Sequence, residues 1–339
     1  RLRDSTPMPA SEEATVRLTR LGLEGDGANR QLFELLWKRD LLSNQSVAVR
    51  IPDTVVIKFN YPSVWYFTST DGTLKRKHKS KLSDEYIFQQ FVKRPADSGI
   101  VAYYVHTDVD TEDAHKGLAQ NVPAPTTIEY LSEAQLHDFL FNRQRQRGSG
   151  LLQRFLEPPG ERNNMIRALW SPKVCLLERR LNCLNLYDTR YDMYERAVTF
   201  EGPDFHSEVT PVRGSTLANK IHQIAETIVQ HVKGATSDRV NITRLALNFK
   251  VDHKDHLYFL FASSVRLSAP PAGSIPLEVN TQLQVPENIH RAQSVSRVAP
   301  AILLRSCSCP TCQEKVHAEM LFDVSYNVII EYEEQRRSA

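Results

Sequence analysis

Three thiols and an imidazole within eleven residues near the end of the chain indicate a metal site. These residues are Cys307, Cys309, Cys312 and His317. Tetrahedral zinc prefers such ligands, and we predict a structural zinc site here. Cys307 fits least well, because a Cys-x-Cys step in an extended segment places two side chains on opposite faces. The alternatives are three reduced thiols in a surface loop and a redox-active Cys-x-x-Cys pair.

The other two cysteines, Cys175 and Cys183, could supply the remaining zinc ligand in place of Cys307. Five cysteines, an odd number with three of them clustered, do not suit the disulfide framework of a secreted domain. We therefore expect reduced thiols in a cytoplasmic compartment.

Composition limits the partners. The 42 basic and 40 acidic side chains leave a net charge of +2, whereas nucleic-acid-binding domains usually carry a clear basic excess. No apolar run approaches the roughly 18 residues of a membrane span. We expect protein partners in a large assembly, and neither a membrane nor a nucleic acid.

Motifs for nucleotide chemistry or acyl transfer are missing from the sequence. It contains no Walker loop, no Rossmann glycine fingerprint and no serine nucleophile elbow. Only 13 glycines occur in 339 residues, so few loops can cradle phosphate. These observations argue against ATP as a cofactor and favour a chain that is not an enzyme.

A lysine-rich hairpin is the densest basic feature. Asp71-Gly72 is a strong turn signal between the strands expected at Val64–Ser69 and Thr73–Lys79. The run Lys75–Lys79, with Lys81, could bind an acidic partner such as a tubulin tail. The favoured alternative is a solvated edge strand, where lysines prevent unwanted strand pairing.

Helices and strands alternate along the chain. We expect strands at 54–60, 100–106, 127–131, 151–157, 165–170, 174–180 and 192–200, a hairpin over 245–261, and helices at 28–42, 83–94, 132–140 and 215–233. Ser132 and Gln135 form a capping box. This pattern predicts a mixed α/β (α+β) fold with largely antiparallel sheets and flanking helices.

Composition shifts divide the chain into five segments. We predict an N-terminal arm and helix (1–45), a first α/β subdomain (46–150), a second (151–267), a Pro-rich linker or arm (268–303), and the zinc-type element with a final strand (304–339). Residues 1–27, with Gly22, Gly25 and Gly27, are expected to be a loosely ordered lead-in.

Several short segments occur in a familiar order. They are Val55–Lys58, Leu152–Glu157, Met165–Arg167, Glu178–Arg180 and the hairpin Leu245–Phe261. Over roughly residues 54–267 this order resembles the carboxylate–amine ligase family with the ATP-grasp fold, which includes the tubulin-tyrosine-ligase-like enzymes. The resemblance implies that a strand lysine contacts ATP and that a Gln-containing segment lines the nucleotide. The positions that it marks are Lys58, Gln153, Arg167 and Glu178.

The resemblance also implies a late hairpin whose Asp, Glu and Asn side chains bind magnesium. This chain lacks those residues at the matching positions of its hairpin Leu245–Phe261 and just after it. The first carboxylate would fall near Asn248, and the Glu-x-Asn pair near Phe261 and Ser263. Magnesium needs hard oxygen ligands, usually with a carboxylate, which phenylalanine cannot supply. A degenerate ATP-grasp-like fold without catalysis is therefore expected.

Three functions follow from the sequence. The first is a non-catalytic, microtubule-associated structural protein of a cytoskeletal assembly, specifically a ciliary or flagellar axoneme, because residues 166–267 resemble segments of proteins from flagellated protists and the polar arms can order on a partner. The second is an ATP-dependent carboxylate–amine ligase with altered metal ligands. The third is a ribonucleoprotein component that uses Lys75–Lys81 and Arg143–Arg147 on phosphates.

Overall fold

The computed structural model describes residues 20, 22–41, 44–93, 96–107, 126–212, 214–268, 306–308 and 315–317. The chain divides into two compact units, residues 1–275 and 276–339. The first unit contains two six-stranded sheets, and every described strand pairing is antiparallel. The predicted mixed α+β class with antiparallel sheets is confirmed.

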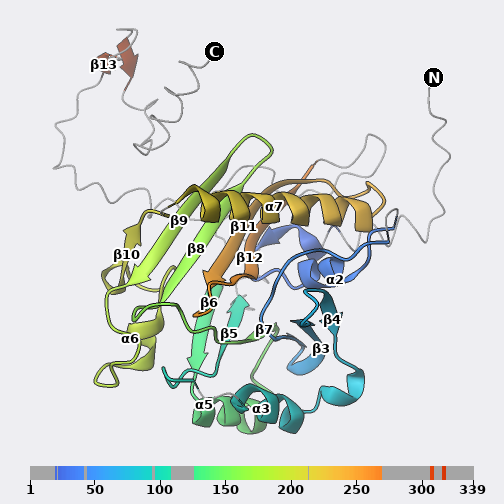
Figure 1. Cartoon of the computed structure of the whole chain (residues 1–339), viewed down its shortest axis with the longest axis vertical. Coiled ribbons are helices and arrows are strands. Elements are labelled where there is room, and N and C mark those ends of the chain that lie inside the picture. Colours follow the sequence, from blue (N-terminus) through green and yellow to red (C-terminus); the bar gives the residue numbers. More distant parts are fainter. Residues whose placement is uncertain are drawn as a thin grey trace, which may run out of the picture. The chain divides into compact units, whose positions relative to one another are not determined.

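Sheet I has the strand order β4-β3-β2-β7-β5-β6 (Figure 1). Its strands are β2 (Thr54–Lys58), β3 (Tyr61–Thr68), β4 (Leu74–Arg76), β5 (Ala102–Thr107), β6 (Thr126–Leu131) and β7 (Gly150–Arg154). The predicted lysine-rich hairpin is confirmed as β3–β4, with Gly72 at φ +81° in its turn. Because β4 lies at the edge of the sheet, the edge-strand interpretation of its lysines agrees with the fold.

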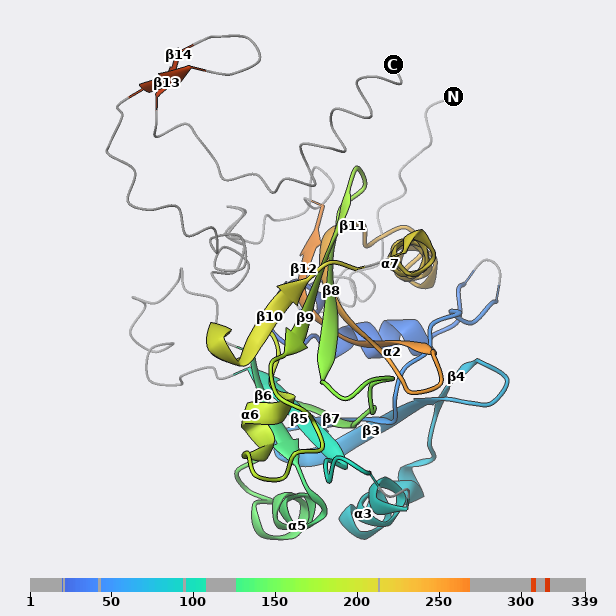
Figure 2. The ribbon, with the colours of Figure 1, turned by 60° about the vertical axis from the view of Figure 1, so that its left-hand side comes forward.

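Helices cover one face of sheet I, where α3 and the α5–η2 segment lie side by side in both views (Figure 2). They are α3 (Asp84–Val92), α5 (Glu133–His137) and the π-helical turn η2 (Asp138–Asn142), with the short η1 (Lys79–Lys81) before them. The capping box of Ser132 and Gln135 is present as predicted. Trp65, Phe91 and Phe139 are buried in the core between these helices and the sheet.

Sheet II has the order β1-β12-β11-β8-β9-β10. Its strands are β1 (Gly25–Asp26), β8 (Asn164–Trp170), β9 (Cys175–Asn182), β10 (Ser207–Thr210), β11 (Ile242–Val251) and β12 (Leu257–Leu267). The helix predicted at 215–233 is α7 (Ser215–Ala235). It packs against this sheet through Ile221, Ala225, Ile228 and Val232. No helix in the described ranges is long and apolar enough to cross a membrane.

Two local predictions are wrong. The strand expected at 192–200 contains helix α6 (Met193–Ala197), which begins with a capping box of Asp192 and Glu195; η3 (Asp204–His206) follows it. The expected loose lead-in is in part a strand, because Gly25 and Asp26 pair with Val265 and Ser264 of β12. Helix α2 (Gln31–Trp37) follows it and buries Leu32, Phe33, Leu35 and Leu36.

The second unit contains a described two-stranded ribbon, β13 (Ser306–Ser308) and β14 (Lys315–His317). Its register pairs His317 with Ser306, and Cys307 with Val316. Cys309 and Cys312 lie outside the described residues. Within the described part of the chain, no group of three or more His, Cys, Asp or Glu side chains could hold a metal ion, and Cys175 and Cys183 are free thiols. The prediction of a zinc site is therefore not supported, and the zinc-type element is withdrawn.

We predict that Gly150→Ala destabilises the protein by about 1–3 kcal/mol through overpacking. A Cβ at Gly150 would lie 2.5 Å from the Val105 carbonyl oxygen and 2.6 Å from the Tyr104 ring. Urea denaturation measures the change. Gly160→Ala is the control, because nothing lies within 4 Å of its Cβ position; equal stabilities of the two variants would contradict the prediction.

Candidate functional site

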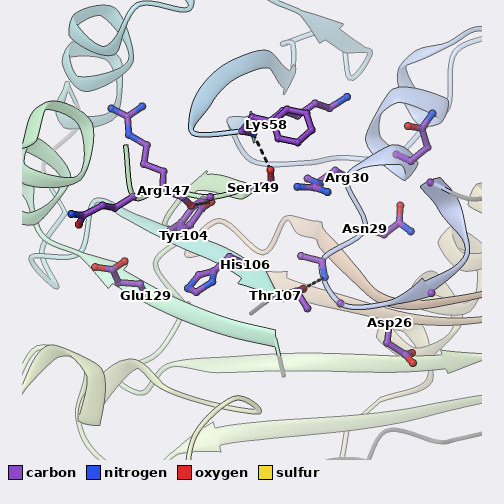
Figure 3. A pocket seen from close by; sticks show the side chains of 18 of the residues that line it. Asp26, Asn29, Arg30, Lys58, Tyr104, His106, Thr107, Glu129, Arg147 and Ser149 are labelled. Atoms are coloured by element: carbon purple, nitrogen blue, oxygen red, sulfur yellow. Dashed lines mark hydrogen bonds between the residues drawn. The ribbon is translucent and has the colours of Figure 1, made fainter. Parts of the chain in front are cut away.

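A cavity of about 1000 Å³ lies where β2 and β5 end and β7 begins (Figure 3). One wall is the segment 22–31, and another is the β2–β3 turn with the loop 146–149 that precedes β7. The side chains that matter below are Asp26, Arg30, Lys58, Phe59, Glu129, Arg143 and Arg147. A volume of this size can hold a nucleotide-sized ligand.

The β2–β3 turn places Lys58 at the cavity. Strand β2 buries Thr54 to Ile57 and leaves Lys58 exposed at its end. Phe59 and Asn60 then adopt left-handed backbone angles, with φ +49° and +74°. The Phe59 amide donates to Ser149 Oγ (2.9 Å), and the Asn60 amide donates to the Gly148 carbonyl (2.7 Å). These bonds attach the turn to the loop before β7.

The opposite wall depends on a close approach between the N-terminal segment and β5. Gly27 has φ +97°, and a Cβ there would lie 2.3 Å from Thr107 Oγ1. The Ala28 amide donates to the same hydroxyl (3.1 Å). Only glycine fits at this position. The contact directs the following residues to the cavity, and Figure 3 shows Arg30 extending toward the turn that carries Lys58.

Some charged side chains that line the cavity form ion pairs within the protein, and others do not. Most form ion pairs within the protein: Arg143 with Glu129 (2.8 Å), Arg147 with Asp84 (3.0 Å), and Arg266 with Asp26 (2.6 Å). Lys58 and Arg30, in contrast, have no ion pair with any described residue. Glu24, which also lines the cavity, has no ion pair with a described residue either, and accepts a hydrogen bond from the Leu267 amide (3.2 Å). Two cations against one carboxylate leave the unpaired groups of the cavity net positive, which is an arrangement that attracts an anion.

Of the four nucleotide positions predicted from the resemblance, only Lys58 lines this cavity. Gln153 is fully buried and connects the two sheets. Its amide nitrogen donates to Thr54 Oγ1 and to the Leu260 carbonyl, both at 2.8 Å, and its oxygen accepts from Tyr103 Oη at 2.7 Å. Because all these donors and acceptors are matched, Gln153 has a structural role here.

Arg167 and Glu178 face each other across β8 and β9. Arg167 Nε donates to Asn248 Oδ1 (3.1 Å), and its guanidinium lies 4.0 Å from the centre of the Phe200 ring. Burial lowers the pKa of Arg167 to about 10, although Glu178 and Glu201 oppose the shift. Glu178 also pairs with Arg180 at 3.3 Å. These residues form a network of polar contacts on sheet II, centred on the buried Arg167.

The late hairpin does not fit a magnesium ion. Asn248 pairs with Phe261 in the β11–β12 register, and its side-chain amide donates to Ser263 Oγ (3.3 Å), so the three positions do lie together as expected. The Asn248 oxygen already accepts from Arg167. A buried guanidinium therefore takes the Asn248 oxygen, Ser263 Oγ accepts from the Asn248 amide, and Phe261 offers no oxygen, so these positions supply no carboxylate for magnesium.

Lys250 is a buried cation that the sequence interpretation missed. Its Nζ donates to Asn163 Oδ1 (2.6 Å) and lies 3.9 Å from the centre of the Phe155 ring. Burial lowers the pKa of Lys250 to about 7, with Glu157 and Glu201 opposing the shift. A signal was present: the alternation of apolar residues in β11 places Lys250 and Asn248 together on its second face.

Comparisons with known proteins found weak structural similarity to solved structures. No protein-family model matches the chain, and no curated protein matches it. The solved structures include the macrocyclase MdnC with its precursor peptide MdnA from Microcystis aeruginosa (10% identity, TM-score 0.35, 76% of this chain and 56% of that one). They also include the ATP-grasp ligase PsnB with a minimal precursor (10%, 0.34, 75% and 54%). A third is carboxyaminoimidazole ribonucleotide synthase from Aspergillus clavatus with ATP (6%, 0.31, 64% and 41%).

This chain thus spans about half the length of these proteins. Its two antiparallel sheets agree with the largely antiparallel sheets expected from the sequence.

The prediction of a non-catalytic ciliary or flagellar axonemal protein is not retained: the solved structures reported above are a macrocyclase, a ligase and a synthase. Two observations on which this prediction rested, a loose N-terminal arm and a free basic run, also do not hold in the fold. Residues 25–26 form a strand, and Lys77 of the basic run lies 3.5 Å from the centre of the Trp65 ring. The prediction that ATP is not a cofactor is not retained either; the carboxyaminoimidazole ribonucleotide synthase named above was solved with ATP.

We predict that Lys250→Met flattens the pH dependence of stability between about pH 7 and 9. The folded pKa of Lys250, about 7, lies below its usual 10.5, so the unfolded chain binds more protons in this window. The wild-type free energy of unfolding should therefore rise with pH, by at most about 1.4 kcal/mol per unit. Urea denaturation across this range measures the slope, with the exposed Lys173→Met as control. The same slope in Lys250→Met and wild type would refute the assignment.

Proposed function

We propose that the chain is an ATP-dependent ligase that binds the nucleotide's phosphates in the cavity at Lys58 and Arg30. The observation that carries this proposal is the pair of cations without an ion pair to a described residue, in a cavity whose other arginines are paired with carboxylates. A triphosphate supplies the missing negative charge and acceptor oxygens, and charge-assisted hydrogen bonds to it are the strong kind.

Arg30 and Lys58 would have different roles in binding the phosphates. Arginine presents a planar set of N–H donors that can bind two phosphate oxygens at once, whereas lysine acts as a compact positive charge. Arg30 would orient the phosphates, and Lys58, attached firmly through its turn to Ser149, would stabilise negative charge that develops during transfer. ATP would transfer its γ-phosphoryl group to a substrate carboxylate and leave as ADP, and an amine would then attack the acyl phosphate and displace inorganic phosphate to form the amide.

Titration with ATP tests this function. We expect wild type to bind ATP, and both Lys58→Ala and Arg30→Ala to weaken binding by roughly 10- to 100-fold, the effect of losing one charge-assisted hydrogen bond. Isothermal titration calorimetry measures the affinity. Lys173→Ala, an exposed lysine between β8 and β9, should bind as wild type does. A wild-type protein that binds no ATP would overturn the proposal.

Metal removal provides a second prediction. The hairpin offers no free side-chain oxygen for a metal at Asn248 or Phe261, and the phosphates are assigned to side-chain cations. We therefore expect the ATP dissociation constant in EDTA to stay within about threefold of its value with magnesium, a difference of ~0.6 kcal/mol. Calorimetry in both buffers measures it, and a loss of binding in EDTA would contradict this arrangement.

A further inference from the structure

Phe59 is an aromatic residue whose exposure the fold does not explain. It lies next to Lys58, lines the cavity, and is 84% exposed, the largest value among the exposed large apolar residues of the described chain. Burial in the core therefore does not account for a phenylalanine here. A large exposed ring beside a cation is suited to contact a flat apolar ligand.

The backbone at Phe59 is unfavourable for a bulky residue. Its φ of +49° lies in the left-handed region, where glycine or asparagine is the usual choice. Hydrogen bonds to Ser149 and between Asn60 and Gly148 hold the turn in this conformation. Strain that the surrounding structure enforces is a feature of ligand-binding sites, and here it presents the ring at the cavity.

The space between the two sheets is closed to a base. Tyr103, Tyr130 and Phe155 contact one another there, with ring centres 6.2–6.4 Å apart, and all three are at most 7% exposed. Phe200 is also buried and packs against Arg167. For a nucleotide with its phosphates at Lys58 and Arg30, these buried rings offer no exposed face to the base, whereas Phe59, next to Lys58 in the lining of the cavity, does.

We infer that the Phe59 ring is the stacking surface for the base of the nucleotide. This inference rests on the proposed function, because the phosphates fix which end of the ligand reaches the ring. Stacking on an aromatic ring tolerates different bases, since every base has a π-face. ATP and GTP should therefore bind with similar affinity.

The test compares ATP with inorganic tripolyphosphate, which has the charge but no base. In wild type, ATP should bind more tightly than tripolyphosphate. Phe59→Ala should weaken ATP binding by roughly tenfold, the usual loss for one stacked base, and leave tripolyphosphate binding unchanged. Phe59→Trp should retain ATP affinity. Tyr61→Ala is the matched control, because Tyr61 is an exposed aromatic residue, 66% exposed, that does not line the cavity.

The outcomes separate the two proposals. If wild type binds neither compound, the proposed function fails, and the inference with it. If it binds both and Phe59→Ala changes neither affinity, only the stacking role is overturned. Equal weakening of both compounds in Phe59→Ala would show that the ring acts by positioning Lys58, and this also overturns the stacking role.

Discussion

A buried amide forms a direct polar contact between the two sheets of the first unit. Gln153 of β7 donates to the Leu260 carbonyl of β12 and to Thr54, and accepts from Tyr103. An amide left unpaired at this depth would cost about 1–3 kcal/mol, so the sheets must meet in a register that satisfies it. Tyr103, which donates to this amide, also contacts Tyr130 and Phe155 in the aromatic cluster between the sheets.

Charged side chains in the interior have polar or aromatic partners, whereas two cations that line the cavity have no ion pair among the described residues. Inside, Arg167 lies on Phe200 with Asn248 and carboxylates close by, and Lys250 has a lowered pKa because burial disfavours its charged form. At the cavity, Lys58 and Arg30 have no ion pair with a described residue. Buried charges must be paired or neutralised, whereas charges that face solvent can remain available to a ligand.

The error in the cytoskeletal hypothesis has a physical explanation. It treated the lysine-rich hairpin and the N-terminal segment as surfaces for a partner. In the fold, Lys75 pairs with Asp71, Lys77 lies over Trp65, and Asp26 pairs with Arg266. A sequence shows the number of charges in a segment, but it does not show how many are already compensated within the molecule.

The sequence by itself determined the local elements: the Asp71-Gly72 hairpin, the Ser132 capping box, the apolar stripe of α7, and Lys58 at the end of a buried strand. It failed at 192–200, where a capping box overrides strand-like alternation. Only the tertiary structure decided which predicted site residues meet. Arg30 reaches the cavity of Lys58 because β1 pairs with β12, some 240 residues later, and no local pattern encodes so distant a contact.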